Sequence, residues 1–207
     1  MRTTSTIAML VVPLVILLAS SEASAARRRG AGIHRGVYLY GAPGVVQIPL
    51  EDDNYADLDP TWGWGFGVGY LWTPTRYFKL SLGGAFEHTI YNWDDIDRDD
   101  VDGNMLRMNA EFRIGGGGRR VWGYALAAPG MSLSLVDVNN GGDDTDAGFG
   151  MTVGAGIQGA VWRSLFLGGE LAGNLNWFPD QDDSPFGLDR DYRIHQLWVK
   201  FMVGWYF

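Results

Sequence analysis

Apolar and small or polar residues alternate one by one along much of this chain. In the segment 62–72, one face carries Trp62, Trp64, Phe66, Val68, Tyr70 and Trp72, whereas the other carries four glycines and Leu71. Strict alternation over such a length indicates a β-strand. Because one face holds large rings and the other has almost no side chains, we expect the rings to point outward and the glycines to face a narrow interior.

Seven further segments show the same period of two. They are Gly36–Ala42, Tyr77–Tyr91, Met105–Ile114, Val121–Val136, Gly148–Trp162, Leu165–Phe178 and Tyr192–Phe207. Pro43 is expected to end the first of them. Pro129 and Gly130 interrupt the fifth, and there we expect a bulge that changes the phase of the alternation.

The connections between these segments alternate in length. Long connections cover 43–61, 92–104, 137–147 and 179–191, and short ones cover 73–76, 115–120 and 163–164. A meander with its long loops at one end and its tight turns at the other is an up-and-down antiparallel β-barrel. Transmembrane barrels share this layout, with short periplasmic turns and long outer loops. We therefore predict an all-β, eight-stranded transmembrane barrel with both termini at the periplasmic end.

The charges are divided between the two ends of the predicted barrel. Of 24 acidic residues, 20 fall in the four long connections, whereas Arg76, Arg119, Arg120 and Arg163 fall in the short ones. The formal net charge of −8 argues against a nucleic-acid partner. The chain has no cysteine, so no disulfide stabilises it.

The first residues have the composition of an export signal. Arg2 precedes an apolar run from Ile7 to Leu18, which is followed by Ala23-Ser24-Ala25. This run is too short to span a bilayer, which needs about 20 residues, and Ala-Ser-Ala suits signal peptidase cleavage. We predict a signal peptide over 1–25 and a single barrel domain over 26–207.

The last strand of the chain has an apolar outer face made by Phe201, Val203, Trp205 and Phe207. An alternating strand that ends on Phe resembles the assembly signal of outer-membrane barrels. With the WGWGFGVGY segment and the loop pattern, the mature chain resembles the small eight-stranded barrels of the OmpA-domain, OmpX and OmpW kind. The resemblance implies location in the cell outer membrane, and lipids, lipopolysaccharide and the barrel assembly machinery as partners. A lipocalin-type barrel is the soluble alternative, but its outer face would carry many charges.

Several ionisable residues lie on the same strand faces as the small and polar residues, and they should therefore face the lumen. Besides Lys79, they are Glu87, Arg107, Glu111, Arg113, Glu170 and Lys200. Counting back from the connection 179–191 places Glu170 opposite Lys200, and the tight turn at Arg163-Ser164 places Gly156 on the other flank of Glu170. The equivalent count around 92–104 places Glu87 near Arg107 and Asn109. Because buried ions must be paired, we predict a network of ion pairs inside the barrel.

Two functions remain open for this network. It either plugs the barrel as a structural core, or it lines a narrow, gated pore for small solutes. A lipid-modifying enzyme is a weaker alternative, because His34, His88 and His195 form no recognisable catalytic arrangement with a serine. We predict a non-enzymatic protein of the envelope with acidic outer loops, without a cofactor or a dedicated metal site. The acidic loops are candidates for weak binding of divalent cations.

Overall fold

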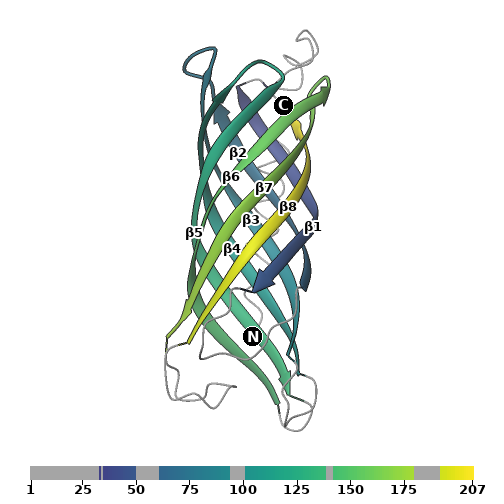
Figure 1. Ribbon diagram of the computed structural model, residues 1–207, viewed down its shortest axis with the longest axis vertical. Helices are drawn as coiled ribbons and strands as arrows, with labels where there is room; N and C mark the ends of the chain where they lie inside the picture. Colours follow the sequence, from purple (N-terminus) through teal and green to yellow (C-terminus); the bar gives the residue numbers. More distant parts are fainter. Residues whose placement is uncertain (1–32, 34, 50–60, 94–100, 139–141, 180–191) are drawn as a thin grey trace, which may run out of the picture.

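The computed structural model describes residues 33, 35–49, 61–93, 101–138, 142–179 and 192–207. These residues form eight strands joined in one closed barrel (Figure 1). The strands are β1 (Gly36–Pro49), β2 (Thr61–Trp72), β3 (Phe78–Trp93), β4 (Val101–Gly117), β5 (Val121–Val138), β6 (Gly142–Trp162), β7 (Leu165–Phe178) and β8 (Tyr192–Tyr206).

Each strand pairs with its neighbours in the sequence, and β8 pairs with β1 to close the wall. Every pairing is antiparallel, from β1–β2 through to β7–β8. The predicted eight-stranded up-and-down barrel is therefore confirmed. No helix in the described part of the chain is long and apolar enough to cross a membrane.

Several strands are longer than the alternation predicts. The first strand does not end at Pro43 but continues to Pro49, because a bulge between Ala42 and Val45 absorbs Pro43 and Gly44. A bulge lets the ladder resume beyond a residue that cannot pair. Strands β4, β5 and β6 also reach further into the long connections than predicted. Acidic residues assigned to loops consequently lie on these strands, namely Asp102, Asp137, Asp143, Asp144 and Asp146.

The bulge predicted at Pro129 and Gly130 is wrong. Gly130 pairs with Asn109 and Ala127 pairs with Phe112, so the register between β4 and β5 is the same on both sides of Pro129. Leu126 and Ala128 before Pro129, and Ser132 and Ser134 after it, are all buried, and Pro129 itself faces outward. Pro129 lacks the N–H needed for a ladder bond. The chain loses that bond locally but inserts no extra residue.

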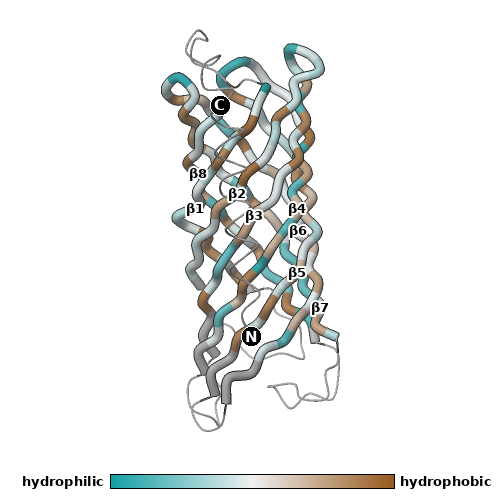
Figure 2. Tube along the Cα trace, turned by 180° about the vertical axis from the view of Figure 1, so that it is seen from behind, coloured by the Kyte–Doolittle hydropathy of each residue, from teal (hydrophilic) through white to brown (hydrophobic). Residues whose placement is uncertain are grey.

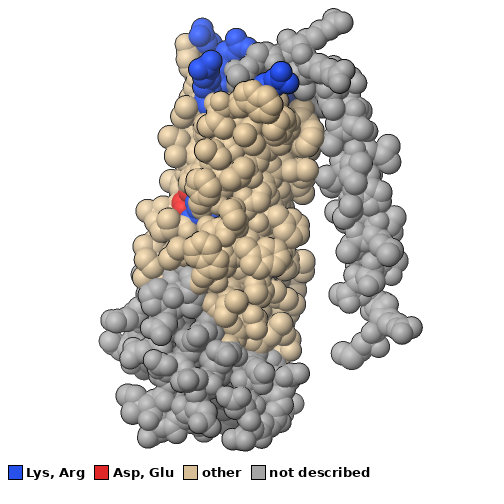
Figure 3. Space-filling view, turned by 90° about the vertical axis from the view of Figure 1, so that its right-hand side faces the viewer, with Lys and Arg blue, Asp and Glu red and all other residues tan. Residues whose placement is uncertain are grey.

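The two faces of the wall differ in chemistry. Figure 2 shows apolar and polar residues interleaved along the strands, as expected when successive side chains point to opposite sides. Large apolar side chains are exposed on the outside, among them Phe66 at 54% and Ile157 at 56%. In the face seen in Figure 3, the wall of described residues is almost free of charged residues, and Lys and Arg gather at the end with the short turns.

The predicted signal peptide over 1–25 lies outside the described residues, as do the acidic stretches 50–60, 94–100 and 180–191. These predictions therefore stay predictions.

Candidate functional site

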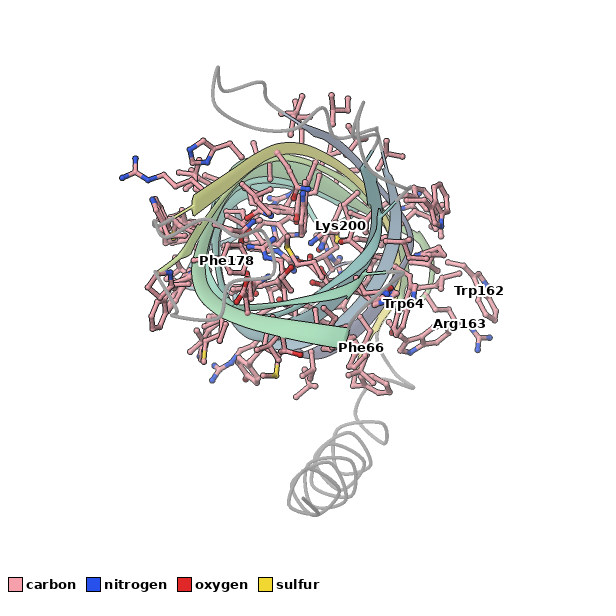
Figure 4. The ribbon with its side chains drawn as sticks, turned by 90° about the horizontal axis from the view of Figure 1, so that it is seen from below. Trp64, Phe66, Trp162, Arg163, Phe178 and Lys200 are labelled. Carbon is pink, nitrogen blue, oxygen red and sulfur yellow. The ribbon has the colours of Figure 1, made fainter. Side chains whose placement is uncertain are left out.

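The candidate site is a group of charged side chains in the middle of the lumen. Its members all face inward and are at most 4% exposed: Glu87 on β3, Arg107, Glu111 and Arg113 on β4, Glu170 on β7, and Lys200 on β8. Successive side chains of a strand point to opposite faces, and these six residues occupy the positions that point into the barrel. Figure 4 shows Lys200 pointing into the barrel, whereas Trp64, Phe66 and Trp162 point away from it.

Lys200 joins the three carboxylates of the group. Its Nζ forms an ion pair with Glu87 Oε1, lies 3.2 Å from Glu170 Oε1 and lies 4.0 Å from Glu111 Oε1. Glu170 is directly opposite Lys200 in the β7–β8 ladder, and Gly156 is opposite Glu170 on β6, as the sequence count predicts. The single ammonium therefore connects β3, β4 and β7 through the interior.

Arg113 forms a second centre in the same layer. Its Nη2 lies 3.1 Å from Glu111 Oε1 and 3.3 Å from Glu170 Oε2, and its Nη1 donates to Tyr38 Oη at 3.1 Å. The guanidinium also lies 5.1 Å from the ring centre of Tyr40 and 5.3 Å from that of Tyr124. Such desolvated cation–π contacts each contribute up to about 2 kcal/mol.

Arg107 extends the network toward the long connections. It pairs with Glu87, with 3.7 Å between Nη1 and Oε2, and donates to Thr152 Oγ1 at 3.0 Å. Its guanidinium covers the ring of Trp198 at 4.5 Å. Asn109 donates to the same Glu87 oxygen at 2.9 Å, so Glu87 meets both residues that the sequence places near it.

Three acids and three bases make this layer neutral as a whole. Neutrality matters because an unpaired ion in a low-dielectric interior costs several kcal/mol. Tyrosine hydroxyls add further donors: Tyr40 donates to Glu111 at 2.7 Å and Tyr124 donates to Glu170 at 3.0 Å. Saturation is nevertheless incomplete, since within the described residues Glu111 Oε2 and Arg113 Nε make no hydrogen bond.

The tyrosines are the part of the network that the sequence analysis missed. Tyr38 and Tyr40 lie on β1 opposite Gly69 and Gly67, and each ring fills the space that the glycine leaves free. The signal was available, because inward glycines on β2 imply large inward residues on a neighbouring strand. The apolar character of both faces of β1 concealed it.

Lys79 faces the lumen, as predicted, but stands apart from the network. It is 2% exposed and lies near the short turns, where its Nζ donates to the carbonyls of Gly117 at 3.0 Å and Gly118 at 2.9 Å. Lys79 therefore joins β3 to the turn between β4 and β5.

His88 lies on the barrel wall beside a polar side chain and a tryptophan ring. His88 Nε2 is 3.1 Å from Asn104 Oδ1, and the ring of His88 lies 5.5 Å from that of Trp64. Among the described residues, no three His, Asp or Glu side chains are close enough together to hold a metal ion. His34 lies outside the described residues.

The family model described as "Outer membrane protein beta-barrel domain" matches residues 11–207. The chain belongs to this family. Small outer-membrane barrels have a lipid-facing apolar band and a polar interior, and both features are present here. The exposed rings on the outer wall are therefore the residues suited to contact lipid.

Solved structures of outer-membrane barrels have the same fold. Neisserial surface protein A aligns with 83% of this chain and 96% of its own, at 13% identity and a TM-score of 0.53. OprG from Pseudomonas aeruginosa aligns with 85% and 99%, at 10% identity and a TM-score of 0.51. The outer membrane enzyme PagL aligns with 82% and 99%, at 13% identity and a TM-score of 0.42. The first two alignments, with TM-scores above 0.5, show the fold alone at identities this low. No curated protein sequence matches the chain.

The C-terminal residues lie where an outer-membrane barrel closes. Phe201 and Trp205 on β8 face outward and are 49% and 36% exposed. Val203 pairs with Gly41 of β1, and the Phe207 N–H donates to the Val37 carbonyl at 2.8 Å. These contacts show that the last residues form the closing seam. Their role as an assembly signal stays a prediction.

Proposed function

We propose that this outer-membrane barrel is a non-enzymatic envelope protein that presents acidic loops at the cell surface and has a lumen closed by its own side chains. The observation that carries the closed lumen is the ion network, which links β1, β3, β4, β5, β7 and β8 across the interior. An eight-stranded barrel is just wide enough for side chains to fill it.

Large side chains fill the lumen on both sides of this layer. Toward the short turns, Trp122 and Tyr206 donate to Gln158 Oε1 at 3.1 and 2.7 Å, and Phe166 packs against Tyr206. Toward the long connections, Ser132 donates to Asn176 at 2.8 Å beside the stacked Arg107 and Trp198. A solute would have to displace several hydrogen-bonded side chains in succession.

The distribution of charge supports the surface role. Five acidic residues fall in each of the stretches 50–60, 94–100 and 180–191. The turns at the opposite end carry Arg76, Arg119, Arg120 and Arg163 (Figure 3). In outer-membrane barrels the long loops face outward and the short turns face the periplasm. The acidic stretches would therefore meet the surroundings of the cell, including lipopolysaccharide and the divalent cations bound to it.

A narrow channel is the second candidate, and one observation favours it. The network is not saturated, since Glu111 Oε2 and Arg113 Nε make no hydrogen bond within the described part of the barrel. An unsaturated set of ions has alternative pairings available. If Lys200 and Arg113 moved to other partners, the same charges would line an ion path.

Single-channel recording in planar bilayers separates the two functions. We expect the refolded protein to show no openings. Glu170→Ala and Lys200→Ala remove two partners of the network, and Leu171→Ala, on the outer face beside Glu170, is the matched control. Regular openings of the unmodified protein that change in conductance with Lys200→Ala, but not with Leu171→Ala, would establish the channel and refute the closed lumen.

A further inference from the structure

A basic pocket of about 400 Å³ opens at the end of the barrel that carries the short turns. Three separate parts of the chain form it: the entry to β1, the turn between β2 and β3, and the turn between β4 and β5. Among the residues that the structure describes, its lining contains four cationic side chains and no acidic one: Ile33, Arg35, Thr73, Pro74, Thr75, Arg76, Lys79, Gly118 and Arg119. None of these residues belongs to the ion network of the lumen.

The backbone holds the walls of this pocket in place. The Ile33 N–H donates to the Arg119 carbonyl at 2.6 Å, which fixes the chain before β1 against the β4–β5 turn. The Thr75 hydroxyl accepts the Phe78 N–H at 3.0 Å, which shapes the β2–β3 turn. Arg76, Lys79 and Arg119 are thus brought to one pocket by the fold itself, where their like charges repel one another.

The donors suit a phosphate group. Lys79 is buried and uses two of its three N–H bonds on the Gly117 and Gly118 carbonyls, so one donor remains. Arg35, Arg76 and Arg119 are exposed, and Arg35 donates a hydrogen bond to Tyr70. Guanidinium groups bind phosphate oxygens in pairs, with a geometry that lysine alone does not offer.

The outer wall has an apolar depression, and some residues of its lining are next in the sequence to residues of the basic pocket. It has a volume of about 360 Å³, and its lining includes Trp72, Leu80, Ile114, Ala125 and Ala127. Trp72 precedes Thr73 of the basic pocket, and Leu80 follows Lys79. The depression forms because Ala125 and Ala127 are small, whereas Ile114 and Phe112, opposite them in the ladder, are large. It is suited to an acyl chain.

We propose that these two features bind one anionic phospholipid of the membrane leaflet at the turn end of the barrel. The basic pocket takes the phosphodiester of the headgroup, and the depression takes part of an acyl chain. A leaflet of anionic lipids attracts basic side chains at the membrane surface, and the position of both features at one end of the wall fits a single amphipathic molecule. The proposal is independent of whether the lumen conducts.

Native mass spectrometry of the protein in detergent, with phosphatidylglycerol added, tests this proposal. We expect a one-to-one lipid complex. Arg76→Gln combined with Arg119→Gln should weaken binding about 30-fold, since each basic residue near an anionic membrane surface contributes about fivefold to the affinity. Arg163→Gln is the matched control, because Arg163 lies in another short turn, covers Trp162 and does not line the pocket. Equal binding by the double variant and the unmodified protein would overturn the proposal.

Two further measurements distinguish a phospholipid from a free phosphate as the ligand of the pocket. Ala125→Phe fills the depression from outside the lumen, and it should weaken phosphatidylglycerol binding while leaving the affinity for glycerol phosphate unchanged. Inorganic phosphate should bind at least tenfold more weakly than the lipid. If inorganic phosphate binds as tightly as the lipid, or if Ala125→Phe has no effect on the lipid, the pocket is a site for a free anion and the lipid proposal fails.

Discussion

Arg113 contacts two carboxylates and three tyrosines at the centre of the lumen. Its partners come from strands far apart in the sequence: Tyr38 and Tyr40 on β1, Tyr124 on β5 and Glu170 on β7. Removing one partner of a buried ion pair is costly because the other is left charged in a medium of low dielectric constant. At the residue scale, the charges in the lumen therefore have to stay balanced.

We therefore expect Arg113→Ala to lower the free energy of unfolding by about 3 to 5 kcal/mol. Glu111 and Glu170 would lose their shared guanidinium, and Lys200 and Arg107 would be left to balance three carboxylates. The measurement is urea unfolding of the protein in lipid vesicles, followed by tryptophan fluorescence. Arg193→Ala is the control, because Arg193 is exposed on β8, and it should change stability by less than about 0.5 kcal/mol. Equal effects of the two substitutions would contradict the role of the network.

At the element scale, β1 and β2 fit together as rings against glycines. Tyr38 and Tyr40 face Gly69 and Gly67, and a Cβ added at Gly69 would lie 2.5 Å from Tyr38 Cζ and 2.8 Å from Cε1. These tyrosine rings in turn position the hydroxyls that bind Arg113 and Glu111. The inward glycines of β2 are therefore needed for packing in the lumen.

Gly69→Ala should destabilise the barrel by about 1 to 3 kcal/mol, because the methyl group would push Tyr38 out of its position. Gly84→Ala is the matched control. A Cβ at Gly84 on β3 would meet only the Asn109 carbonyl oxygen, at 3.6 Å, which is ordinary contact. The same unfolding experiment gives both values. A loss with Gly84→Ala as large as that with Gly69→Ala would show that strand propensity, and not the fit to Tyr38, governs this position.

The sequence predicts these elements well where alternation is strict, and poorly where a proline or the length of a strand matters. The bounds of β7 are as predicted, because Leu165–Phe178 alternates without interruption. Pro43 and Pro129 have different effects, a bulge and an unbroken register, because the outcome depends on the neighbouring strands and not on the proline itself. The extra length of β4, β5 and β6 comes from pairing with one another beyond the apolar band, where a polar residue such as Asp144 still has a ladder partner, Val136.

At the scale of the whole molecule, the closed wall explains why the ion network could be located from the sequence. In a meander, consecutive strands pair with each other, so the pairing of Glu170 with Lys200 follows from counting back from the connection 179–191. Contacts between strands that are not neighbours, such as Lys200 with Glu87 across the lumen, depend on barrel closure and side-chain length. No local pattern encodes them, and neither does any pattern encode the basic pocket formed by three parts of the chain.

The central claim is that the outer wall meets lipid while the lumen is filled. Since the chain has no cysteine, single cysteines for spin labels can be placed freely along β7. Leu167 and Leu171 face outward, and Ala172 and Asn174 face inward.

Collision of these labels with oxygen and with a water-soluble nickel complex, measured by electron paramagnetic resonance in vesicles, tests both halves of the claim at once. We expect labels at 167 and 171 to collide frequently with oxygen and rarely with nickel, as in lipid, and labels at 172 and 174 to be shielded from both. Frequent collision of the inward labels with nickel would reveal a water-filled lumen, and oxygen accessibility without a period of two would show that the wall does not face lipid.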